Sequence, residues 1–174
     1  MEMIDCNVGK CVGCRICEVI CSTHHFGAVS PALSRIRVAK LEEIGIESAV
    51  ACLSCLEKPC LECPNAALSV GDRGQILLDI QLCSGCRECV DACPIGAAGF
   101  YDDQPLFCDL CSGEVCCVGA CPSAALSYRE DYKGISLGSF EPSQGNSAQK
   151  RTRYVRVQGE AVRECWKNGA RVDS

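Results

Sequence analysis

The residues of this sequence that could do chemistry are cysteines, and they are gathered in short runs. The run "CSGCRECVDACP", residues 83–94, holds four of them at spacings of two, two and three residues, followed by Pro94. The whole chain has 19 cysteines in 174 residues, a density typical of disulfide scaffolds and metal proteins. The first question is therefore which of these two classes the spacing favours.

Most of the cysteines fall into four blocks, and only Cys6 and Cys165 stand alone. Block I is Cys11, Cys14, Cys17 and Cys21; block II is Cys52, Cys55, Cys60 and Cys63; block III is Cys83, Cys86, Cys89 and Cys93; block IV is Cys108, Cys111, Cys116, Cys117 and Cys121. The short, repeated spacings and the odd total fit disulfide pairing poorly. They favour metal binding.

Blocks I and III have the spacing of the bacterial ferredoxin run, in which three cysteines hold one iron–sulfur cluster. The fourth cysteine of such a run ligates a neighbouring cluster. Pro94 suits the first turn of a helix, where its missing N–H costs nothing, so we expect a short helix to begin there. His24 and His25 follow block I closely, and we expect them to cap a loop or to hydrogen-bond near a cluster.

Blocks II and IV are less regular. In block IV, Cys117 reproduces the C-x3-C-P ending of block III whereas Cys116 does not, so we predict that Cys117 is the ligand. Block II is one residue short before its Cys-Pro pair, and its C-x2-C-x4-C-x2-C pattern also suits two zinc hooks. The sequence therefore leaves a cluster and a zinc ion open for block II.

Composition excludes several other classes of protein. The formal net charge of −5 argues against non-specific nucleic-acid binding, and no apolar run is long enough to span a membrane. The N-terminal residues do not resemble a secretory signal, so we expect a reducing, cytoplasmic setting. No nucleophile–base pair, phosphate loop or dinucleotide fingerprint is visible, so we do not expect an enzyme.

The segments between the blocks predict small hairpins and short helices. Strands are expected at the N-terminus, around residues 36–46, and after blocks II, III and IV, with a short helix after each Cys-Pro pair. This is an α+β plan, a doubled bacterial-ferredoxin-like fold around iron–sulfur clusters over residues 1–137. Residues 138–174 form a locally basic tail, either disordered or an arm that docks on a partner through Tyr154, Val155, Val157 and Trp166.

With these motifs in view, residues 5–130 resemble the four-cluster ferredoxin-type electron-transfer subunits of molybdenum and tungsten oxidoreductases. The segments "CVGCRICEVICSTHHFGAVSPALSRIRV" and "FCDLCSGEVCCVGACPSAAL" are similar to the small subunits of tungsten aldehyde oxidoreductases and of class II benzoyl-CoA reductases. The resemblance implies that blocks I and IV pair, as do blocks II and III. The implied ligand sets are Cys11, Cys14, Cys17 and Cys121 (set 1); Cys108, Cys111, Cys117 and Cys21 (set 2); Cys83, Cys86, Cys89 and Cys63 (set 3); and Cys52, Cys55, Cys60 and Cys93 (set 4).

The functional expectation is a relay of single electrons through three or four [4Fe–4S] clusters, with one zinc ion as the alternative in set 4. The resemblance implies a catalytic partner that carries a tungsten or molybdenum pterin, and a further redox partner such as a ferredoxin or a flavoprotein. A stand-alone polyferredoxin carrier and a zinc-stabilised structural module are the competing hypotheses. The sequence names neither the substrate of the partner nor the direction of electron flow.

Overall fold

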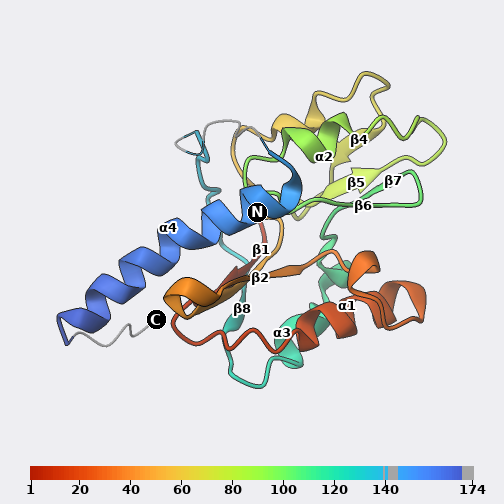
Figure 1. Cartoon of the computed structure of the whole chain (residues 1–174). Coiled ribbons are helices and arrows are strands. Elements are labelled where there is room, and N and C mark those ends of the chain that lie inside the picture. The colour runs from red at the N-terminus through yellow and green to blue at the C-terminus, as the bar shows by residue number, and fades with distance from the viewer. Residues whose placement is uncertain (139, 141–144, 170–174) are drawn as a thin grey trace.

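The computed structural model describes residues 1–138, 140 and 145–169. Small strands and short helices alternate along most of the chain, and one long helix follows near the C-terminus (Figure 1). The strands are β1 (Met3–Cys6), β2 (Arg37–Leu41), β3 (Ile46–Val50), β4 (Leu68–Val70), β5 (Ile76–Leu78), β6 (Gly99–Tyr101), β7 (Gln104–Leu106) and β8 (Leu126–Arg129). The α-helices are α1 (Ile16–Phe26), α2 (Glu88–Ala92), α3 (Cys116–Gly119) and α4 (Ser147–Lys167).

In the described residues, the strands pair as four two-stranded antiparallel sheets. Three are hairpins, β2–β3, β4–β5 and β6–β7, and each connects one cysteine block to the next. The fourth sheet joins β1 to β8, with Cys6 opposite Leu126, and so brings the N-terminus beside the segment after block IV. The predicted strands are confirmed, and the small mixed α/β architecture is that of a ferredoxin-type domain.

The prediction of a short helix after each Cys-Pro pair is wrong. Each pair instead forms a tight turn, in which the N–H of Ala66, Gly96 or Ala124 donates to the carbonyl of the cysteine three residues earlier, at 3.0, 3.3 and 3.2 Å. Proline suits the second position of such a turn. The residue that closes each turn has a positive φ, between 49° and 63°, which stops a helix from continuing.

The tail predicted over residues 138–174 is ordered as a helix from Ser147 to Lys167. Asn146 and Gln149 form a capping box at its start. Its buried residues are Lys150, Tyr154, Val155 and Gly159. Residues 139, 141–144 and 170–174 lie outside the described residues, so the prediction of disorder or docking is untested there.

Helix α4 lies along the β2–β3 hairpin (Figure 1). Tyr154 and Val155, which the docking-arm alternative placed against a partner, pack in this chain's own core with Leu41, Ile46 and Val50. Val157 and Trp166 are exposed. Sequence reasoning did not predict this helix, because two of its four buried residues are a lysine and a glycine, so the buried face does not read as an apolar stripe. No helix among the described residues is long and apolar enough to cross a membrane.

Candidate metal centres

The cysteine runs of blocks I and III fold into the same loop. Gly13 and Gly85 have φ values of 60° and 70°, and Arg15 and Arg87, two residues later, have φ values of 63° and 71°. A helix begins immediately after each arginine, α1 in block I and α2 in block III. The glycines are required: a Cβ at Gly85 would lie 2.9 Å from the backbone oxygen of Asp103.

Set 1 lies at one end of the molecule, near α1 and β8. Its four thiols, Cys11, Cys14, Cys17 and Cys121, line one small pocket. Cys14 is exposed and Cys17 is buried, so the set reaches from the core to the surface. Cys6, which stands outside the four blocks, lies beside Cys11, and their hydrogen bond lowers the pKa of the Cys11 thiol to about 6.

Set 2 lies deeper, where α1 packs against α3. Its four thiols, Cys21, Cys108, Cys111 and Cys117, are all buried. Burial, followed by repulsion from Cys21, raises the pKa of the Cys117 thiol to about 12. The backbone N–H of Arg35 donates to the sulfur of Cys21 at 3.2 Å.

The two adjacent cysteines of block IV, of which Cys117 is the predicted ligand, lie in different surroundings. Cys117 is buried beside Cys21 and Cys111. Cys116 is less buried, and its sulfur lies 3.5 Å from Nδ1 of His24 and within 4.8 Å of the sulfur of Cys111. Cys116 therefore points toward a histidine at the edge of set 2.

Set 3 lies at the opposite end of the molecule, beside α2 (Figure 1). Burial, followed by the charges of Cys63, Cys86 and Cys83, raises the pKa of the Cys89 thiol to about 11. These four thiols are therefore neighbours, although Cys63 comes from block II. Cys86 is exposed, so this set also reaches the surface.

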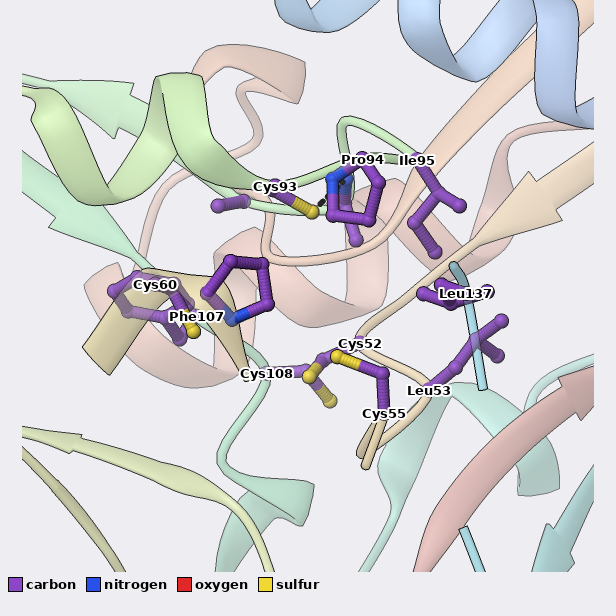
Figure 2. Close-up of a pocket in the computed structure, with 13 residues that line it drawn as sticks. Cys52, Leu53, Cys55, Cys60, Cys93, Pro94, Ile95, Phe107, Cys108 and Leu137 are labelled. Carbon is purple, nitrogen blue, oxygen red and sulfur yellow. Dashed lines mark hydrogen bonds between the residues drawn. The ribbon is translucent and has the colours of Figure 1, made fainter. Parts of the chain in front are cut away.

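Set 4 lines an apolar cavity in the middle of the chain (Figure 2). Cys52, Cys55 and Cys60 come from block II, Cys93 comes from block III, and their sulfur atoms surround the cavity. Burial, followed by the charges of its thiol neighbours, raises the pKa of Cys52 to about 11 and that of Cys60 further. The N–H of Ala97 donates to the sulfur of Cys93 at 3.3 Å.

The donor chemistry of the four sets fits a thiolate-ligated metal group. In each set four thiols converge, and burial and mutual repulsion keep several of them protonated when no cation is bound. Thiolates are the ligand form, so a bound metal group would supply the positive charge that lets them ionise together. Cysteine thiolates are also the ligands that hold [4Fe–4S] clusters.

The sequence did not reveal the polar group that supports block IV. Asp109 forms an ion pair with Arg35 and lies 3.3 Å from Nε2 of His25, and its side chain accepts the N–H of Cys111 at 3.1 Å. Hydrogen bonds to Asp109, Cys111 and Cys21 raise the pKa of His25 to about 11. The prediction that His24 and His25 hydrogen-bond near a thiol set agrees with these contacts. The partners of these histidines are far away in sequence, so no local motif identified them.

These features are typical of the thiolate sites of ferredoxin-type domains. The family described as the 4Fe-4S binding domain matches residues 76–98, which include the three C-x2-C-x2-C cysteines of block III. The chain therefore contains a 4Fe-4S binding domain, as block III predicted.

The chain is related to iron–sulfur electron-transfer subunits of oxidoreductases. It is 45% identical over 87 residues to the polyferredoxin-like subunit of an aliphatic sulfonate oxidoreductase from Pyrococcus furiosus, covering 49% of this chain and 50% of that protein. It is 35% identical over 102 residues to the electron transport protein HydN of Escherichia coli K12, covering 55% and 58%. It is 36% identical over 100 residues to a formate dehydrogenase iron–sulfur subunit of Wolinella succinogenes, covering 55% and 49%.

The chain thus spans about half the length of the curated relatives it matches. Among solved structures, the active site complex BamBC of benzoyl coenzyme A reductase with 1,5-dienoyl-CoA contains a similar chain. That chain is 27% identical, with 97% of this chain and 98% of that chain covered, at a TM-score of 0.46. The expectation of a protein related to iron–sulfur subunits of oxidoreductases is confirmed.

Proposed function

We propose that this chain is the electron-transfer subunit of an oxidoreductase, with a [4Fe–4S] cluster held by each of the four thiol sets. A cluster in each set would accept and release one electron at a time. The observation that carries the proposal is the convergence of sixteen thiols from distant blocks into four neighbouring groups. The same pairing, I with IV and II with III, supports a doubled ferredoxin-like fold.

The order of the thiol sets supports a relay. Cys17 of set 1 lies near Cys117 of set 2, and Cys108 of set 2 lies near Cys52 of set 4 and faces the same cavity (Figure 2). Cys60 of set 4 and Cys89 of set 3 pack in one hydrophobic cluster. The sets therefore follow one another in the order 1, 2, 4, 3.

The two ends of this series suit electron entry and exit. The exposed thiols Cys14 and Cys86 belong to sets 1 and 3, which are the first and last in the order. We propose that one end faces a catalytic subunit with a tungsten or molybdenum pterin, and the other a ferredoxin or flavoprotein. The chain itself performs no substrate chemistry in this proposal, and its free thiols suit a reducing compartment such as the cytoplasm.

The spacing of the set 4 thiols supports a cluster rather than zinc in this proposal. A tetrahedral zinc ion with Zn–S bonds of about 2.3 Å needs sulfur atoms roughly 3.8 Å apart. Among the described residues, three potential ligand atoms lie within 4.8 Å of one another only around Cys111, and no three thiols of set 4 do so. A cavity surrounded by more widely separated thiols suits a larger group.

The test is the metal and sulfide content of the chain purified without oxygen. We expect about sixteen irons and a similar amount of acid-labile sulfide per chain. About twelve irons with about one zinc would assign zinc to set 4, and a folded, colourless chain without sulfide would refute the proposal. Size-exclusion of the native material separates the alternatives: a subunit elutes with its catalytic partner, whereas a stand-alone carrier elutes alone.

A further inference from the structure

A second pocket, which none of the thiols lines, lies between α2, β6 and the start of α4. It has a volume of about 330 Å³. Arg37, Arg87 and Arg151 line it together with Asn146, Ser147 and Ala148 from the first turn of α4. Three guanidinium groups at one pocket are unexpected in a chain whose formal net charge is −5.

Mostly neutral groups hold these arginines in place. Arg37 donates to the carbonyls of Pro31 and Ala32, and Arg151 donates to the carbonyl of Gly96 at 2.6 Å. Among the described residues, no carboxylate lies within 4.0 Å of either guanidinium. Burial, followed by the charge of Arg37, lowers the pKa of Arg151, so the two cations lie close enough to repel each other.

Two carboxylates near the pocket, Glu18 and Asp91, also have other partners. Glu18 is buried and accepts the N–H of Val38 at 2.8 Å and a guanidinium N–H of Arg15 at 3.3 Å. Asp91 lies 3.5 Å from Nε of Arg87, but both side chains are half exposed. The guanidinium of Arg87 also stacks over the ring of Phe100, 5.3 Å from its centroid. These contacts leave an excess of positive charge at the pocket.

The first turn of α4 adds donors on another side. The Asn146 side chain accepts the N–H of Gln149, but no described residue accepts the N–H of Ser147 or Ala148. The hydroxyl oxygen of Ser147 is buried and has no hydrogen-bond partner among the described residues. The first turn of a 21-residue helix also carries the positive end of the helix dipole.

We propose that this pocket binds a phosphate group. A phosphate offers oxygens in several directions and up to two negative charges, which suits three guanidinium groups and a helix N-terminus better than a flat carboxylate does. Arg37, Arg87 and Arg151 supply the charge, and Ser147 and Ala148 supply neutral donors. The phosphate is either free in solution or carried by a nucleotide-like ligand.

The pocket adjoins thiol set 4, because Ala98 lines both cavities. If the proposed function holds, a bound phosphate places negative charge beside the cluster of set 4 and makes its reduction less favourable. The pocket would then couple a soluble anion to the relay. The binding of phosphate does not depend on this consequence and can be measured alone.

The test is isothermal titration calorimetry on the anaerobically purified full chain at low salt, with orthophosphate and with ADP as separate probes. We expect saturable binding at one site per chain for at least one probe. Equal affinities indicate free phosphate as the ligand, and tighter binding of ADP indicates a phosphate carried by a nucleotide. No saturable binding of either probe overturns the proposal.

Substitutions of the pocket arginines test whether phosphate binds in this pocket. Arg151→Gln and Arg87→Gln each remove one charge and are expected to weaken binding about tenfold or more. Arg153→Gln is the matched control, because Arg153 lies on the exposed face of the same helix and makes the same charge change. Equal loss in the control and in the pocket variants contradicts the proposal. Among the described residues, the ion pair and the ring contact of Arg87 are to Asp91 and Phe100, not to α4. Arg87→Gln therefore decides the question if Arg151→Gln misfolds.

The same samples separate this proposal from the electron-transfer function. Iron and sulfide content are measured on each one before titration. Normal phosphate binding by a chain that lacks iron refutes the proposed function and leaves the phosphate site intact. A chain with full iron content that binds no phosphate refutes the phosphate site and leaves the proposed electron-transfer function intact.

Discussion

Gly159 of helix α4 lies directly against Ile46 of strand β3. A Cβ atom added at Gly159 would lie 2.7 Å from Cγ2 of Ile46, closer than side chains normally approach. Because Ile46 is buried with Tyr154 and Val155 in one core cluster, this contact sets how closely α4 approaches the β2–β3 hairpin. The glycine thus allows a polar, 21-residue helix to pack on the domain.

Substitution of Gly159 by valine should therefore loosen α4. Overpacking of a filled core costs about 1–3 kcal/mol, and here the cost falls on the helix contact. We expect a lower thermal midpoint and faster proteolysis within residues 145–167. Gly119→Ala is the control, because nothing lies within 4 Å of a Cβ at that helical glycine. A midpoint unchanged in Gly159→Val would show that α4 does not depend on this contact.

The adjacent cysteines of block IV should differ in their effect on metal content. Cys117→Ser removes a buried thiol of set 2, so we expect a loss of about four irons per chain or failure of that half to assemble. Cys116→Ser changes a thiol that faces His24 and should leave the iron content unchanged. Iron analysis and electron paramagnetic resonance of the reduced proteins measure both. The opposite result would make Cys116 the ligand.

Glu18 is expected to contribute to the stability of the fold, because its carboxylate is buried in the core. This carboxylate accepts the N–H of Val38, so Glu18→Ala leaves a buried donor unsatisfied. Such a loss costs about 2 kcal/mol, or roughly 4–8 °C in the thermal midpoint of a chain this size. Glu18→Gln retains an acceptor and should lose less. Glu88→Ala, at an exposed position one residue before Cys89, is the control and should change the midpoint little.

Asp109 should hold the block IV loop in its left-handed conformation. Leu110, Cys111 and Ser112 all have positive φ values, and the Asp109 side chain accepts the N–H of Cys111. Asp109→Asn keeps an acceptor but loses the ion pair with Arg35, whereas Asp109→Ala loses both. We expect iron release to a chelator to be fastest in the alanine variant and intermediate in the asparagine variant. Equal rates in all three proteins would assign Asp109 no role in the loop.

Much of the proposed metal chemistry follows from the sequence, because three of the four thiols of each set lie close together along the chain. The spacing in blocks I and III is a local property: it fixes which thiols one loop can turn toward one metal group. Strands between the blocks were also predictable, since alternating apolar residues and turn residues act over a few positions. The grouping of Cys93 with block II was implied by resemblance and not by spacing.

Other features were decided only by the tertiary structure. Each Cys-Pro pair forms a turn that closes at a residue with a positive φ: Ala66, Gly96 or Ala124. Alanine rarely adopts a positive φ, so the sequence gives no sign of the turns at Ala66 and Ala124. Helix α4 buries Lys150, whose ammonium group donates to the carbonyl of Asp91 in α2, and Gly159, whose backbone lies against Ile46 of β3. Both contacts form only when these distant segments pack together. The sequence determined what could be assembled within one loop. Contacts between residues many positions apart, including the arginine pocket, depend on how the hairpins and α4 pack, which local patterns do not specify.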